Sequence, residues 1–210
     1  MIVEDAPADD AWEQRFHATI AAERKADRRG ARAFAEACRD GDVDRMSAAV
    51  AFLNANTITG WRLAMRQVGR LPAVSPEIRA AFLNVWIEAK HLPLAVGRRP
   101  TMARALHVLM PPVPLQEPLR LFRGAGALER QRRLYGFSWT TRREIAEQFA
   151  DQARQGSTGS VLLETLAQSG SVHLRREDEG YYDENEIVID PYRLGKVRVV
   201  AKFPPIHGMS

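Results

Sequence analysis

The stretch PPVPLQEPLRLFRG, residues 111–124, decides how the chain is divided, because it separates two kinds of sequence pattern. Its first eight residues include four prolines. Proline fixes the backbone and lacks an amide donor, so residues 111–118 cannot continue a helix and are predicted to form a stiff connector. The apolar run that follows, Leu119–Arg123, is typical of a strand. We therefore expect the chain to change from helices to strands at this connector.

Residues 1–110 are predicted to be a helical region. Apolar residues recur at helical spacing over Asp10–Arg29, and we expect a break at Gly30 before a second helix, Ala31–Arg39. Ser75-Pro76-Glu77 is a strong helix start, with a capping hydroxyl, a proline at the first helical position and an acid in the first turn. The remaining helices are expected over Asp42–Asn54, Trp61–Val68, Pro76 to near His91, and Thr101–Met110.

Residues 119–210 are predicted to be rich in strands. The strands are expected over Leu119–Arg123, Tyr135–Thr140, Ser160–Leu166, Ser171–Leu174, Glu186–Ile189 and Val197–Phe203. Helices are expected over Ala127–Arg133 and Thr141–Gln155, the second capped by Thr140 or Thr141. The fold class is therefore α+β.

Composition limits the partners and the location. The 210 residues carry a net charge of +4, and all but four of the 30 basic residues are arginines. That excess is compatible with an anion, a nucleic acid or an acidic partner, and equally with a GC-rich genome. Residues 1–10 are acidic and lack a secretory signal pattern, and no apolar run could span a bilayer. With Cys38 as the single cysteine, no disulfide can form within the chain. We expect a cytoplasmic protein, or one delivered into a target cell without a cleavable signal.

Three segments in the C-terminal half carry candidate chemistry: Leu121–Gly124, Gly136–Thr141 and Asp183–Asp190. Arg123 closes an apolar strand and can hold a phosphate bidentately, while Gly124 lets a ligand approach the backbone. Ser138, at the end of a second strand, can hold the rotamer of a carboxylate. Each has a simpler explanation, because Arg123 is one arginine among many and the hydroxyls near Thr141 can merely cap a helix.

The third segment contains Glu184 and Glu186 directly before an apolar strand. Strand alternation is expected to place both carboxylates on one face. Such a pair suits a reaction in which positive charge develops on a sugar carbon, because one carboxylate can stabilise the cation while the other orients the attacking group. The alternative is a solvated acidic loop entering a strand.

Taken together, Arg123, Ser138-Trp139-Thr140 and Glu184-Asn185-Glu186 resemble the motifs of the Arg-Ser-Glu class of mono-ADP-ribosyltransferases, which includes arginine-modifying bacterial toxins. The resemblance covers about residues 119–203 and includes the helix behind the central motif. Trp139 departs from the usual small residue, and alternation should point it away from the two hydroxyls.

The resemblance implies a split β-sandwich core over residues 119–210 that binds NAD as substrate, with no metal. Arg123 would hold the NAD phosphates or their ribose, and the backbone of Gly124 would receive the nicotinamide amide. Ser138 would brace Glu186, which would bind the ribose 2′-hydroxyl and stabilise the cation. Glu184 would engage the acceptor, and a Glu at that position goes with arginine acceptors. Further residues expected at the NAD site are Phe122, Thr140 and Tyr181.

The leading hypothesis is thus a toxin- or effector-like enzyme that transfers ADP-ribose to arginine of a target protein, with an inhibitor protein as a further partner. Transfer to RNA or DNA and NAD hydrolysis are alternatives. A second class of hypothesis is an arginine-rich helical binding module joined to an inactive core, which would bind nucleic acid or an acidic protein. Five scattered histidines, without a Cys or HxxxH partner, predict no zinc site.

Overall fold

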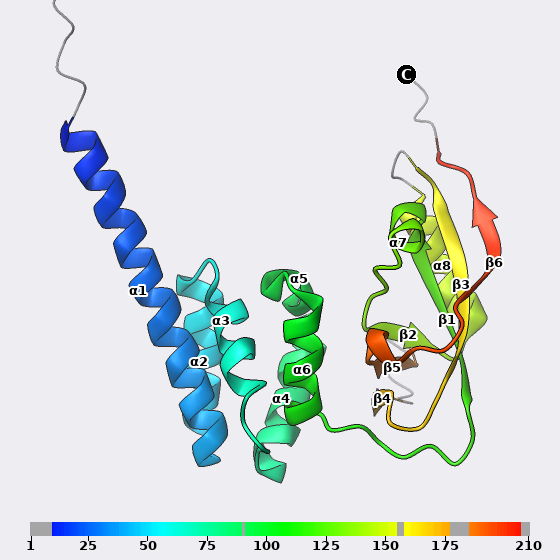
Figure 1. Ribbon diagram of the computed structural model, residues 1–210, viewed down its shortest axis with the longest axis horizontal. Coiled ribbons are helices and arrows are strands. Elements are labelled where there is room, and N and C mark those ends of the chain that lie inside the picture. Colours follow the sequence, from blue (N-terminus) through cyan, green and yellow to red (C-terminus); the bar gives the residue numbers. More distant parts are fainter. Residues whose placement is uncertain (1–9, 90, 155–157, 177–184, 207–210) are drawn as a thin grey trace, which may run out of the picture. The chain divides into compact units, whose positions relative to one another are not determined.

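The computed structural model describes residues 10–89, 91–154, 158–176 and 185–206, and it divides into two compact units, Met1–Leu109 and Met110–Ser210 (Figure 1). The first unit consists of helices and the second contains an open antiparallel sheet. The predicted α+β class, with helices before strands, is confirmed at this level.

The helices of the first unit follow the predicted order, with one addition. They are α1 (Asp10–Asp40), α2 (Val43–Asn56), α3 (Gly60–Val68), α4 (Pro76–Glu88), α5 (Leu92–Val96) and α6 (Arg99–Leu109). Helix α4 begins as predicted, because the hydroxyl of Ser75 accepts the amide of Ile78 at 3.3 Å and Pro76 opens the first turn. The short α5 was not predicted, since its five residues are too few to show a helical period.

The predicted break at Gly30 is wrong, because α1 runs through it without interruption. A Cβ at this position would lie 2.9 Å from Cδ1 of Phe52 and 3.0 Å from Cδ2 of Leu53. Gly30 therefore lets α2 pack closely on α1, and close packing outweighs the intrinsic cost of a glycine in a helix. Although α1 has 31 residues, it is polar, and no helix in the described part of the chain is long and apolar enough to cross a membrane.

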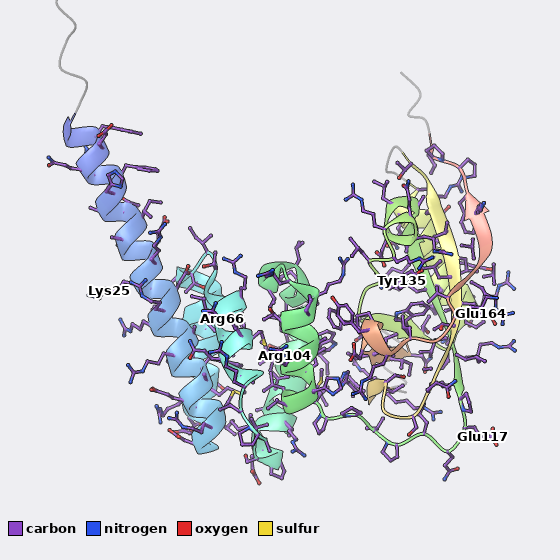
Figure 2. The ribbon with its side chains drawn as sticks, in the orientation of Figure 1. Lys25, Arg66, Arg104, Glu117, Tyr135 and Glu164 are labelled. Atoms are coloured by element: carbon purple, nitrogen blue, oxygen red, sulfur yellow. The ribbon has the colours of Figure 1, made fainter. Side chains whose placement is uncertain are left out.

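The first unit has a well-packed core. Phe34 of α1 meets Trp61 of α3 edge to face, with ring centroids 5.4 Å apart. The largest fully buried side chains of this unit are Phe34, Phe82, Met46, Leu53, Met65, Ile78, Leu92, Met102, Leu106 and Leu109. The outer faces of the helices carry arginines, among them Arg66 on α3 and Arg104 on α6 (Figure 2).

The second unit is built on one six-stranded sheet in the order β4-β5-β2-β1-β3-β6. Its elements are β1 (Leu119–Gly126), α7 (Ala127–Gln131), β2 (Ser138–Thr140), α8 (Arg143–Ala153), β3 (Ser160–Ala167), β4 (Val172–Arg175), β5 (Glu186–Ile189), a 3-10 turn at Pro191–Arg193 and β6 (Arg198–Phe203). Strands β1 and β2 are in register only at Phe122 and Thr140, so a narrow seam joins the trio β4-β5-β2 to the trio β1-β3-β6.

The two faces of the sheet are covered differently. One face carries an apolar cluster that includes Leu121, Trp139 and Ile187, and residues of the predicted connector, Val113 and Leu115, pack against it. The connector is therefore part of the second unit, and the amide of Val113 donates to the carbonyl of Val172 at 2.8 Å. Helix α8 contacts the strands β1, β2 and β3.

Candidate active site

A cavity of about 170 Å³ opens at the seam between β1 and β2. Strands β1, β2 and β5 and helix α8 all contribute to its wall. The lining residues are Phe122, Arg123, Gly124, Ser138, Trp139, Thr140, Ala146, Phe149 and Glu186. All six of the described residues that the sequence proposed for the NAD site are in this wall. Glu184 and Tyr181 lie outside the described residues.

Strand register explains how distant residues reach one cavity. Thr140 of β2 is directly opposite Glu186 of β5, and Ser138 is opposite Val188. Since side chains alternate, Ser138, Thr140 and Glu186 share one face of the sheet. Trp139 and its partner Ile187 belong to the apolar cluster on the other face. The prediction that Trp139 points away from the two hydroxyls is confirmed by this burial.

Arg123 donates three hydrogen bonds to two groups of the protein. Its Nε donates to Oε1 of Glu129 at 3.0 Å and its Nη2 to Oε2 of the same carboxylate at 3.3 Å, while its Nη1 donates to the carbonyl of Ser138 at 2.7 Å. The side chains of Arg123 and Glu129 are only 22% and 20% exposed. The bidentate edge that the sequence assigned to a diphosphate therefore binds Glu129 in this structure.

Glu129 is a partner of Arg123 that sequence reasoning missed. It lies on α7, six residues after Arg123, and its Oε1 also accepts the amide of Gly136 at 3.1 Å. The contact forms because α7 follows β1 directly and folds back beside it. An acidic residue in a short, polar helix gives no signal of that return in the sequence.

The presence of glycine at two positions near Arg123 is explained by packing within the protein. A Cβ on Gly124 would overlap the backbone of Ala146 and Ala150, so this glycine lets α8 lie directly on β1. A Cβ on Gly136 would lie 2.5 Å from Nη2 of Arg123, so that space belongs to the guanidinium. The sequence had explained Gly124 by the approach of a ligand, but the closest neighbour of its missing side chain is the helix.

Thr140 supports the turn into α8 rather than capping the helix in the usual way. Its hydroxyl accepts the amide of Arg142 at 3.1 Å, two residues ahead, which is the pattern of a hydroxyl-closed turn. The helix then begins at Arg143, two residues later than predicted, and its N-cap residue Arg142 makes no side-chain cap bond.

Glu186 is half-buried at the first position of β5. Within the described residues its carboxylate has no hydrogen-bond or ion-pair partner, and no bond to the hydroxyl of Ser138 is formed. A half-buried carboxylate beside a cavity is therefore open to a ligand. The bracing of Glu186 by Ser138 remains a prediction.

The shared face predicted for Glu184 and Glu186 stays a prediction, because Glu184 lies outside the described residues. The strand begins only at Glu186, and Asn185 has a left-handed backbone with φ of 42°. A left-handed residue breaks the two-residue period, and asparagine tolerates it better than most residues.

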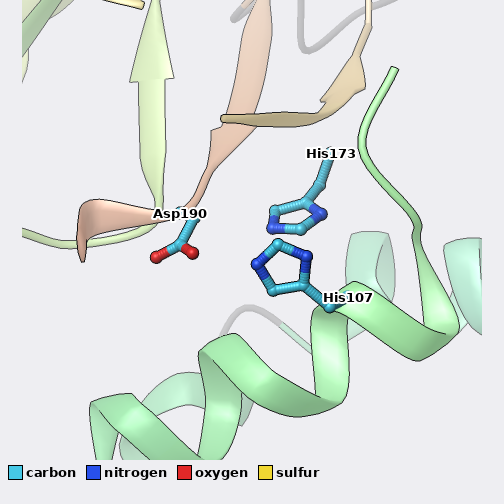
Figure 3. A group of neighbouring side chains, drawn as sticks. All are labelled: His107, His173 and Asp190. Carbon is cyan, nitrogen blue, oxygen red and sulfur yellow. The ribbon is translucent and has the colours of Figure 1, made fainter. Parts of the chain in front are cut away.

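Figure 3 shows the side chains of His173, on the neighbouring strand β4, and of Asp190, just after β5. Nδ1 of His173 lies 2.6 Å from the carbonyl of Met110. Asp190 is buried and accepts the amide of Tyr192 at 2.9 Å, so it caps the following 3-10 turn. Both residues help to anchor the β4–β5 end of the sheet.

No protein-family model matches the chain, and no curated protein and no solved structure is significantly similar to it.

Proposed function

We propose that the second unit is an NAD-dependent mono-ADP-ribosyltransferase with a split β-sandwich core. The observation that carries this proposal is that Arg123, Ser138 and Glu186, from three different strands, line one cavity. The narrow seam between β1 and β2 is also what a split sheet requires. A volume of about 170 Å³ is below the roughly 300–1,000 Å³ of pockets that enclose whole ligands, so the cavity would take only one end of NAD.

The proposed reaction exchanges one bond at the anomeric carbon of the nicotinamide ribose. The bond from that carbon to nicotinamide breaks, and its electron pair leaves with nicotinamide. Glu186 binds the ribose 2′-hydroxyl, and its negative charge stabilises the oxocarbenium ion that develops. A guanidine nitrogen of the acceptor arginine then forms the new bond to the carbon and loses a proton, for which Glu184 is the proposed base.

The Glu-x-Glu motif supports an arginine of a target protein, in the manner of a toxin or effector. Transfer to nucleic acid and hydrolysis by water use the same cation and differ only in the attacking group. The proposal also includes an inhibitor protein as a partner and the cytosol as the site of action.

Incubation with NAD labelled in its ADP-ribose part tests the proposal, with cell lysate as a source of acceptors. We expect nicotinamide release and labelled macromolecules with the wild type, and loss of both with Glu186→Ala. Glu144→Gln is a matched control, because the side chain of Glu144 is 59% exposed and pairs with Arg142. Absence of NAD consumption in the wild type, or equal activity of Glu186→Ala, would refute the assignment.

A second candidate function, binding of a nucleic-acid backbone by the first unit, is favoured by one observation. Arg62, Arg66 and Arg70 are exposed at spacings of four residues along and just beyond α3. Consecutive members of such a row are about 6 Å apart along a helix axis. Arg104 of α6 joins them, because its Cγ lies 3.1 Å from the Cβ position of Gly69. Residues 45–76 contain no acidic residue, and none of these four arginines has an ion pair within the described residues.

A row of guanidinium groups without carboxylate partners is suited to bind the phosphates of a nucleic acid. The salt dependence of that binding tests this function. We expect binding of a single-stranded oligonucleotide to weaken steeply with salt, and Arg66→Ala to reduce the slope of log K against log salt by about 1. Arg143→Ala is the control, because Arg143 lies in the second unit and already pairs with Glu147 at 2.8 Å. Equal effects of the two substitutions would exclude this surface.

A further inference from the structure

Glu129 joins β1 to the entry of β2. Its carboxylate accepts from Nε and Nη2 of Arg123 and also from the amide of Gly136. The third hydrogen bond of Arg123, from Nη1 to the carbonyl of Ser138, links the guanidinium directly to β2. One carboxylate thus contacts both the guanidinium of Arg123 and the backbone two residues before Ser138.

Donor counting shows what Arg123 can still offer to a ligand. A guanidinium has five N–H groups in a rigid planar fork. Glu129 occupies two of them and Ser138 a third, so two remain, both on the Nη atoms. Arg123 is among the residues that line the cavity.

The positive charge of Arg123 is balanced by the carboxylate of Glu129. Its partner carboxylate is bidentate, and both side chains are about one-fifth exposed. A phosphate that used the Nε–Nη2 edge would have to displace Glu129 and leave its carboxylate without that partner, which is costly for a partly buried charge. A ligand that used the two remaining donors would not have to displace it.

We propose that Glu129 is the positioning residue of the NAD site, which holds Arg123 so that its two remaining Nη donors bind NAD while the Glu129 contact persists. This inference rests on the proposed function. The opposite possibility is that Glu129 competes with NAD for Arg123 and so inhibits binding. The two roles predict changes of opposite sign in NAD affinity when Glu129 loses its charge.

Glu129→Gln separates the two roles because it retains the shape of the side chain. An amide offers one oxygen in place of two and turns an NH₂ group toward Nη2 of Arg123, so the guanidinium is no longer held on both nitrogens. Positioning predicts that the dissociation constant of a non-cleavable carbocyclic NAD analogue rises roughly tenfold or more, the scale of one charge-assisted hydrogen bond. Competition predicts a lower constant.

Titration calorimetry of the full chain measures this constant, and circular dichroism gives the melting temperature of each variant. In an Arg123→Lys background, Glu129→Gln should cause no further loss, because Glu129 acts through the arginine. Should Glu129→Gln fold poorly, Gly136→Ala takes its place, since its methyl group displaces Nη2 and leaves Glu129 intact; it should weaken binding to a similar extent.

The outcomes are distinct. Weaker binding by Glu129→Gln, with no further loss in the Arg123→Lys background, supports the proposal. Unchanged or tighter binding by Glu129→Gln, with a wild type that does bind, overturns the role of Glu129 and leaves the proposed function intact. A wild type that binds neither NAD nor the analogue overturns the proposed function, and the role of Glu129 with it.

Discussion

Replacement of Gly124 by alanine should destabilise the second unit, because helix α8 occupies the space that a side chain would need. The added methyl group would overlap the carbonyl oxygen of Ala146 and the amide nitrogen of Ala150. These atoms belong to the backbone of a helix and cannot rotate away, unlike the end of a flexible side chain. Either α8 moves as a body or β1 bends.

Overpacking of this kind costs roughly 1–3 kcal/mol. For a unit of about 100 residues, each kcal/mol shifts the melting temperature by about 4–8 °C, so we expect a drop of roughly 5–20 °C. Gly126→Ala is a matched control two residues along the same strand. A Cβ there meets nothing within 4 Å, and its φ of −63° suits any residue. Alanine at that position should be neutral, or stabilising by about 0.4–1 kcal/mol.

Hydrogen exchange of peptides from β1 and β3 is the assay of choice, because it reports on the second unit without interference from the helices of the first. Gly124→Ala should speed the exchange of these peptides, and thermal unfolding should confirm the lower stability. If Gly124→Ala and Gly126→Ala are equally stable, the direct packing of α8 on β1 is wrong.

Three further predictions concern other parts of the chain. Asp27→Ala should destabilise the first unit by about 3 kcal/mol in urea unfolding, because this buried carboxylate accepts from the amides of Ile58 and Thr59 and the hydroxyl of Thr59; a change below that of Thr59→Ala would contradict this. Burial raises the pKa of the Cys38 thiol to about 12, so the native protein should resist thiol reagents at pH 8.5 and lose stability as the pH rises above 9, where the unfolded thiol ionises first. Rapid labelling of folded protein would be the contrary result. Glu184→Gln should depress transfer to arginine far more than NAD cleavage, and equal loss of both activities would contradict the division of roles between the two acids.

Much of the fold was predictable because its signals are local. The cap at Ser75 and Pro76 depends on neighbouring residues only, and the burial of Trp139 follows from the two-residue period of a strand. Gly30 shows the limit of local reasoning. A glycine that favours a break in an isolated helix is retained within α1 because α2 packs against it.

The candidate site was predictable as a set of residues but not as a network. Arg123, Ser138 and Glu186 were identified from their motifs, and the sheet brings them to one cavity. The partner of Arg123 was missed, since Glu129 becomes its neighbour only when α7 folds back on β1. The left-handed backbone of Asn185, directly before β5, was not predicted, because asparagine tolerates this conformation without requiring it.

The central claim is that one cavity at the seam of β1 and β2 receives the nicotinamide end of NAD. A crystal structure of Glu186→Gln grown with NAD tests it most directly, because this change preserves the shape of the site and should slow cleavage. We predict that nicotinamide and its ribose lie between Arg123, Ser138 and residue 186. NAD bound elsewhere, or an empty cavity at saturating NAD, would contradict the account.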